Sequence, residues 1–504
     1  MRVAGRRLPQ PLHVLRAQPL TVTRNAIWLL ACRISGDFLN LLFFVIISRV
    51  FGPPGVGAYS YGFAVTGFVL VIGSLGIEEY GLREYARMKV ADRSQFMAEL
   101  LGTQLVTIVG ALVGVGIYLS LTSPSNATLG IIASLAYYQA ALSLSSSLFI
   151  PAMGQQHMMG RALIDLICRA VAFIFAGLAI YVWHTPVPKA LLGYVLAATL
   201  LILLSIWSAA KHGGALRISV SWDALVKIAT VLWSFAAVEV LAQLFARVGV
   251  IVLSLKVSEA AAGLYATGLR LIETGLMPLA FMGIAVYPHL SHLFREDKIA
   301  FQSVGLNFIW AMLVAGLILS WGLYFVAPSL LVPLLGSKYA GTEPVIMAMA
   351  ALALMQALEL GMGRVLFAAD LQVPRAVAIL LGATSALALN LLLVPKFAVD
   401  GAIAAGVLSF IIINIVYFLA LRHPMRGTKF QQALLIPLAG LTLGIVVAWQ
   451  CAAHRTLPWV QACASALVFV LVAGGGFWIT RGRELLAARV RTDLMANREP
   501  RESL

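Results

Sequence analysis

Long uninterrupted apolar stretches constrain this chain more than any other feature. About fourteen of them reach 20 or more residues, close to the length that an α-helix needs to cross about 30 Å of hydrocarbon. Hydrophobic residues make up 61% of the chain and charged residues 11%, whereas roughly 25% of the residues in a soluble globular protein are charged. The sequence therefore predicts an all-α polytopic membrane protein with about 14 transmembrane helices.

Glycine, proline and charged residues separate the apolar stretches and define the predicted spans. The first six spans lie at 26–48, 56–77, 100–120, 128–151, 162–182 and 191–210. The remaining eight lie at 228–255, 260–286, 305–327, 344–366, 376–394, 401–421, 432–453 and 459–479. We accordingly predict a basic tail (1–24), an N-lobe of helices 1–6 (25–211), a C-lobe of helices 7–12 (212–425), helices 13–14 (426–479) and a second basic tail (480–504).

The positive charge of the chain is unevenly distributed between the two sides of the membrane. A net charge of +15 would suggest nucleic acid in a soluble protein, but membrane topology explains it better, so we expect no nucleic-acid partner. Of the lysines and arginines, 25 fall on the side of the two termini and six on the opposite side, which predicts that both termini are cytoplasmic. The four cysteines lack zinc-ligand spacing, so no metal site is expected.

An internal repeat covers the first twelve predicted spans. The second span opens with Gly57-Ala58-Tyr59-Ser60-Tyr61-Gly62 and the eighth with Gly263-Leu264-Tyr265-Ala266-Thr267-Gly268, which share the pattern G-x-Y-x-x-G at an offset of 206 residues. Each repeat has six spans, an even number, so both copies enter the membrane in the same direction. The repeat therefore predicts two parallel lobes, an arrangement that transporters use for alternating access.

Five predicted spans each contain an acidic residue and an arginine. The pairs are Arg33/Asp37, Asp165/Arg169, Glu239/Arg247, Arg270/Glu273 and Glu359/Arg364. Charges at the centre of a bilayer are too costly to face lipid. They either line a watery cavity or form structural ion pairs between helices, and several are spaced closely enough to pair within one helix. A cavity with several arginines suits an anion, because guanidinium groups bind phosphate oxygens in bidentate fashion.

Further motifs are similar to those of a known family. They are Arg24-Asn25-Ala26-Ile27-Trp28, Ser48-Arg49-Val50-Phe51-Gly52-Pro53, Gly73-Ser74-Leu75-Gly76-Ile77, Arg83-Glu84-Tyr85-Ala86-Arg87 and Tyr287-Pro288-His289-Leu290-Ser291. With the repeat and the plan of six, six and two helices, the chain resembles the Wzx-like oligosaccharide flippases over essentially its whole length. These flippases form the polysaccharide transporter branch of the MOP superfamily, to which the MATE transporters also belong.

The resemblance implies a transporter rather than an enzyme. Such a flippase moves undecaprenyl-diphosphate-linked repeat units from the inner to the outer leaflet of the bacterial inner membrane by alternating access. The units supply surface polysaccharides such as the O-antigen of lipopolysaccharide or an exopolysaccharide. The implied partners are the lipid-linked oligosaccharide, the lipid bilayer, a polysaccharide polymerase and the chain-length machinery. We expect no cofactor, and we expect transport to be coupled to H⁺ or Na⁺.

The intramembrane charges supply the predicted site residues. For substrate binding we predict Arg33, Asp37, Arg49, Arg247 and Arg270. For ion coupling we predict Glu239, Glu359 and Glu273. Glu239 and Glu359 lie in the seventh and tenth spans, and Asp37 lies in the first, where related multidrug antiporters keep their coupling acids. We predict no catalytic residue.

Three alternatives remain open. A multidrug or cation antiporter of the same superfamily usually has twelve spans, and arginines suit anions better than cationic drugs. A lipid II flippase carries an arginine in its second span, whereas residues 56–77 contain no charge. A membrane polysaccharide polymerase or ligase needs room for a site on a long outer loop, and every predicted outer loop is shorter than about 20 residues.

Overall fold

The computed structural model describes residues 19–155, 157–213 and 217–426, and all regular secondary structure in these ranges is helical. The first half contains α1 (Pro19–Ser74), α2 (Ile77–Arg87), α3 (Val90–Thr122), α4 (Asn126–Leu148), α5 (Ile150–Gly154), α6 (Met158–Tyr181), α7 (Val187–Ala190) and α8 (Leu192–Lys211). The second half contains α9 (Trp222–Lys256), α10 (Glu259–Glu296), α11 (Lys298–Trp321), η1 (Gly322–Val326), α12 (Ala327–Leu335), η2 (Ser337–Tyr339), α13 (Glu343–Ala368) and α14 (Gln372–Leu421). The predicted all-α polytopic fold is confirmed.

Two of the long helices each consist of two membrane-spanning segments joined at a kink. In α1 the kink lies at Gly52, whose φ of 71° suits glycine, and Pro53 and Pro54 follow without backbone N–H groups to continue the helix. In α14 it lies at Ala398. With these kinks, the ten helices of membrane-spanning length in the described ranges contain the first twelve predicted spans. The last two predicted spans, the C-terminal tail and most of the N-terminal tail lie outside the described residues.

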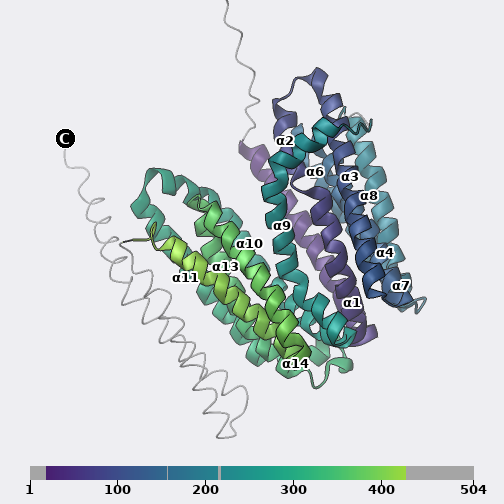
Figure 1. Ribbon diagram of the computed structural model, residues 1–504, viewed down its shortest axis with the longest axis vertical. Helices are drawn as coiled ribbons and strands as arrows, with labels where there is room; N and C mark the ends of the chain where they lie inside the picture. Colours follow the sequence, from purple (N-terminus) through teal and green to yellow (C-terminus); the bar gives the residue numbers. More distant parts are fainter. Residues whose placement is uncertain (1–18, 156, 214–216, 427–504) are drawn as a thin grey trace, which may run out of the picture.

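The helices form two bundles, which meet at one end of the molecule and diverge toward the other (Figure 1). One bundle contains α1, α3, α4, α6 and α8, and the other contains α10, α11, α13 and α14; α9 packs against both α1 and α14. We call the end where the bundles meet the Gly52 end, because the kink of α1 lies there. The opposite end carries α2, and we call it the α2 end.

A hydrophobic core shared by both bundles fills the Gly52 end. Its buried residues include Val56 of α1, Ala262 of α10 and Leu335 of α12. Toward the α2 end the cores separate: one cluster contains residues of α10, α11, α13 and α14, and a smaller one contains residues of α2, α3 and α5 with Ile228 of α9. Among the described residues, the hydrophobic core that the two bundles share therefore lies at the Gly52 end, and α9 bridges the bundles beyond it.

Two glycines of the internal repeat make this close contact possible. A Cβ atom on Gly57 of α1 would lie 1.7 Å from the carbonyl oxygen of Glu259, and one on Gly263 of α10 would lie 1.9 Å from the carbonyl oxygen of Pro53. The two helices thus touch backbone to backbone. We refer to the contact of Gly57 with Gly263 as the glycine seam. Nearby, Thr128 of α4 donates a hydrogen bond to Oε1 of Glu259 at 3.0 Å, which adds a polar contact between the bundles.

Candidate functional site

Arg169 of α6 lies at the centre of a charged cluster in the first bundle. Its Nη1 donates to Oδ1 of Asp37 at 3.1 Å, and its Nε donates to Oδ2 of Asp165 at 3.0 Å. Gly36 allows the close approach, because a Cβ there would lie 2.7 Å from Cδ of Arg169. Arg33 Nε lies 4.0 Å from Oδ2 of Asp37, and its side chain is 73% exposed. Arg169 therefore uses its fork to hold two carboxylates, while Arg33 remains accessible.

A second charged cluster joins α9 and α10. Glu273 lies between two arginines: its Oε1 is 3.4 Å from Nη1 of Arg247, and its Oε2 is 3.7 Å from Nη1 of Arg270. The Nε atoms of both arginines are buried without a hydrogen-bond partner among the described residues. The guanidinium of Arg247 also lies 5.8 Å from the centroid of the Phe63 ring on α1, so this cluster faces the other bundle.

The two clusters differ in formal charge, and the second lies near mid-membrane depth. Two arginines and two aspartates make the first cluster neutral, whereas two arginines and Glu273 leave the second with one excess positive charge. Arg247 lies nine residues before the end of α9, and Arg270 eleven residues after the start of α10. At about 1.5 Å per residue, both lie roughly 15 Å from the Gly52 end, near the middle of a bilayer. The excess charge is thus placed where an anion could be bound inside the membrane.

The predicted coupling acids do not form one site. Glu273 belongs to the second arginine cluster. Glu239 is exposed on α9, and no described residue forms an ion pair with it; one turn further on, Gln243 packs against Gly67 of α1. Glu359 of α13 accepts a hydrogen bond from the Tyr417 hydroxyl of α14 at 3.4 Å. The three acids therefore occupy three different environments.

A second polar contact joins α13 to α14 one turn before Glu359. Asn414 of α14 donates its Nδ2 to the carbonyl oxygen of Met355, one turn before Glu359, at 3.1 Å. The Oδ1 atom of Asn414 is buried and has no hydrogen-bond partner among the described residues. No group of three or more His, Cys, Asp or Glu side chains in the described ranges has the arrangement of a metal site.

Arg49 is separated from the other predicted substrate-binding residues. It lies on the last turn of α1 before the kink, at the Gly52 end, and donates from Nε to the carbonyl oxygen of Leu334 at 2.8 Å and from Nη2 to that of Pro333. In return, Lys338 Nζ donates to the carbonyl oxygen of Val50 at 2.6 Å. Arg49 thus connects the two bundles, while Arg33, Asp37, Arg247 and Arg270 belong to the two charged clusters.

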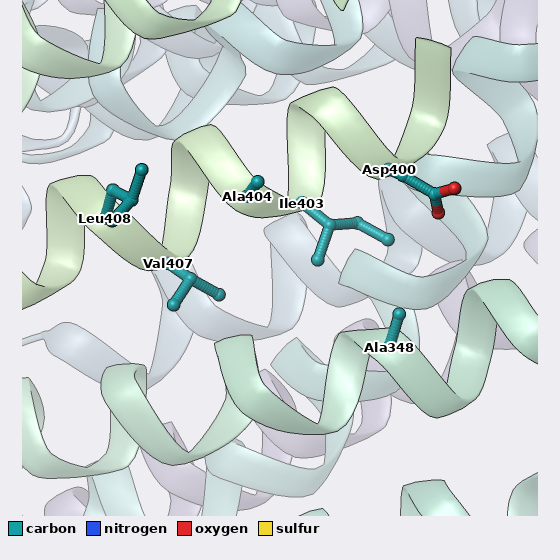
Figure 2. Close-up of a pocket in the computed structure, with 6 residues that line it drawn as sticks. All are labelled: Ala348, Asp400, Ile403, Ala404, Val407 and Leu408. Carbon is teal, nitrogen blue, oxygen red and sulfur yellow. The ribbon is translucent and has the colours of Figure 1, made fainter. Parts of the chain in front are cut away.

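A pocket between α13 and the second half of α14 is also apart from these clusters. Figure 2 shows its lining side chains: Ala348, Asp400, Ile403, Ala404, Val407 and Leu408. Asp400 is the only charged residue among them, and the other five are apolar. The pocket therefore lacks the arginines that an anionic head group needs.

The sequence did not single out Arg169, Lys338 or Tyr417 as site residues. The Asp165/Arg169 pair was visible as an i,i+4 spacing, but its contact with Asp37 requires the packing of α6 on Gly36. Lys338 and Tyr417 have no comparable local signal, because their partners lie 288 and 58 residues away.

Comparisons with known proteins agree with the fold. No curated protein sequence matches the chain. The lipid II flippase MurJ in an inward closed conformation aligns with a TM-score of 0.70 at 14% identity, covering 91% of this chain and 100% of that chain. An inward-facing multidrug resistance MATE family transporter of the MOP superfamily aligns with a TM-score of 0.62 at 14% identity, covering 79% and 98%. An outward-facing multidrug resistance MATE family transporter of the MOP superfamily aligns with a TM-score of 0.51 at 13% identity, covering 81% of this chain and 96% of that chain.

Identities this low show a shared fold, and the family follows from a separate match. The family model described as Polysaccharide biosynthesis protein matches residues 22–294, more than half of the chain. The predicted family is confirmed: this protein belongs to the polysaccharide biosynthesis family of Wzx-like flippases, whose fold is that of the MOP superfamily of membrane transporters.

Proposed function

We propose that this protein flips undecaprenyl-diphosphate-linked oligosaccharide repeat units from the inner to the outer leaflet of the bacterial inner membrane. The undecaprenyl tail can remain in the hydrocarbon, but the diphosphate and the sugars need a polar route across it. We expect this route to run between the two bundles. The unit delivered to the outer leaflet would then serve a polysaccharide polymerase and its chain-length machinery in the synthesis of O-antigen or exopolysaccharide.

The observation that carries this proposal is the sharing of Glu273 by Arg247 and Arg270. One carboxylate cannot neutralise two guanidinium groups, and the Nε donor of each arginine has no partner among the described residues. A diphosphate supplies several acceptor oxygens and negative charge to such donors. Arg33, with Asp37 beside it, is exposed nearer the α2 end and would meet the head group first.

The orientation that suits this function has the α2 end and both termini in the cytoplasm. The bundles diverge toward the α2 end (Figure 1), so the head group would enter from the inner leaflet. With the cell interior negative, moving two anionic charges outward gains roughly 4–5 kcal/mol at 100 mV. The membrane potential would therefore favour export.

For ion coupling we propose Glu359, with Glu239 as the second candidate. Glu359 accepts a hydrogen bond from the Tyr417 hydroxyl, and one turn before Tyr417 on the same helix Asn414 has a buried amide oxygen without a partner among the described residues; such oxygen atoms suit a proton or Na⁺. If Glu359 binds the coupling ion, Glu359→Gln slows export and removes its dependence on the proton or sodium gradient. Export that keeps its full ion dependence in both Glu359→Gln and Glu239→Gln would exclude these residues.

The experiment that tests the function is mass spectrometry of lipid-linked oligosaccharides after depletion of the protein. We expect one undecaprenyl-diphosphate repeat unit to accumulate, facing the cytoplasm, and its mass to identify the sugars. Accumulation of lipid II would instead indicate a peptidoglycan precursor as the substrate. An unchanged lipid-linked pool together with sensitivity to cationic dyes would contradict the proposal in favour of an antiporter.

The arginine pair is tested by complementing the depleted cells with variants. With Arg247→Gln or Arg270→Gln, the lipid-linked unit should remain accumulated. Each change removes a positive charge and two or more hydrogen-bond donors that would otherwise contact the diphosphate. Arg217→Gln, which neutralises an exposed arginine between α8 and α9, should restore export. Normal export by both cluster variants at normal protein levels would show that the arginines are structural.

A further inference from the structure

At the Gly52 end, two helices of different bundles terminate beside each other. The first segment of α1 ends just before Gly52, and α12 ends at Leu335, followed by Gly336 with a φ of 100°. The last turn of any helix leaves carbonyl oxygens without partners inside the helix. These carbonyl oxygens also form the negative end of the helix dipole, where a cation is favourable.

Each of these two helix ends is capped by a cation from the other bundle. Arg49 reaches from α1 to the carbonyl oxygens of Pro333 and Leu334 on α12, and Lys338 reaches back to that of Val50 on α1. The last turn of α12 contains no basic residue of its own. The caps therefore exist only while the bundles are together at this end.

Gly52 and Gly336 leave room for Lys338 and Arg49 to reach the helix ends of the opposite bundle. The side-chain stem of Lys338 lies over Gly52, where a Cβ would be 2.7 Å from its Cδ, and Gly336 faces the backbone of Arg49. Next to Lys338, the buried Tyr339 hydroxyl lies 3.2 Å from Oγ1 of Thr267 on α10. The loop that carries Lys338 is thus fixed to the second bundle, so its bond to Val50 reports the position of one bundle relative to the other.

We propose that Arg49 and Lys338 form a reciprocal clasp that holds the Gly52 end closed and must break when this end opens. Arg49 is then a residue of the closing device and not of the substrate site. The clasp adds to the glycine seam. The seam lets the backbones of α1 and α10 approach closely, and the clasp stabilises the closed arrangement with charge-assisted hydrogen bonds. This inference rests on the proposed function only in assigning the Gly52 end to the outer side, which has to open for release.

The test measures the separation of the bundles directly, in substrate-free nanodiscs. Spin labels are placed on Lys189→Cys of α7, which lies at the Gly52 end (Figure 1), and on Lys396→Cys, two residues before the kink of α14, in a chain whose four native cysteines are replaced. Double electron–electron resonance then gives the distribution of distances between them. Arg49→Met and Lys338→Met keep the aliphatic stems and remove the cations, so that packing over Gly52 is preserved.

We expect each single variant to lower the ratio of short to long distances roughly fivefold, and the double variant about twentyfold, as suits exposed charge-assisted hydrogen bonds. Lys338→Arg, which keeps a cation, should retain the short distance. Lys256→Met, which removes an exposed lysine at the end of α9 outside the clasp, should behave like the parent chain. A double variant that matches Lys256→Met would overturn the proposal.

The clasp and the flippase function fail in different ways. If the clasp variants shift the spin-label distances but depletion of the protein does not cause lipid-linked units to accumulate, the clasp is supported and the proposed substrate is wrong. Accumulation without any shift in the double variant leaves the flippase supported and the clasp wrong.

Discussion

Arg169 of the candidate site holds two carboxylates that come from different helices. It bonds to Asp37 of α1 as well as to Asp165 of its own helix, and its side chain is 23% exposed. Guanidinium is suited to such double contacts because its donors point in fixed directions. The residue thus links α1 to α6 through charge, at a place where Gly36 lets the two helices come close.

Removing the Arg169 side-chain charge should destabilise the protein more than removing either partner. Arg169→Met leaves two carboxylates without their shared cation, at a cost of about 2 kcal/mol, between the values for exposed and buried pairs. Asp165→Asn should cost less, because Arg169 keeps Asp37. Thermal unfolding in detergent checks this order, and equal melting temperatures for Arg169→Met and the parent would contradict it.

At the scale of single helices, the first twelve spans were predictable because each is an apolar stretch of membrane-crossing length. The kinks followed less directly: Gly52-Pro53-Pro54 signals a break in sequence, but Ala398 does not. Which charged side chains pair with each other was harder still to predict from the sequence. The Arg270/Glu273 spacing was visible, whereas the addition of Arg247 depends on how α9 packs against α10. Contacts between distant helices have no local signature, so the sequence could not show that Arg49 of α1 reaches carbonyl oxygens of α12.

The contact of α1 with α10 gives a sharp test at this scale. Gly57→Ala or Gly263→Ala places a methyl group within 2 Å of a backbone carbonyl oxygen of the opposite helix, so the helices must move apart. We expect the Gly52 end to open and export to fall, with protein levels near normal. Cysteine labelling at the seam and the export assay measure the two effects.

A matched glycine controls for the added methyl group itself. No atom of the described residues lies within 4 Å of the Cβ position at Gly110 of α3, so Gly110→Ala should leave both measurements unchanged. If the seam variants behaved like Gly110→Ala, close packing of α1 on α10 would not be required for closure.

For the whole molecule, the distribution of lysine and arginine predicts which end faces the cytoplasm. Ser123 lies between α3 and α4 at the Gly52 end, and Arg217 lies between α8 and α9 at the α2 end. In intact spheroplasts of a chain without native cysteines, a membrane-impermeant maleimide should label Ser123→Cys. It should label Arg217→Cys only after permeabilisation, and the reverse pattern would invert the proposed direction of transport.

The glycine seam also carries information about ancestry. Gly57 approaches the carbonyl oxygen of Glu259, and Gly263 approaches that of Pro53; both the two glycines and the two oxygen-bearing residues are 206 positions apart. Such a contact is isologous, with the same patch on both sides, as in a twofold-symmetric dimer. Two copies of a six-helix protein could meet in this way before any gene fusion. Expressing the two halves as separate chains would therefore test whether two six-helix units can assemble through this contact without being fused.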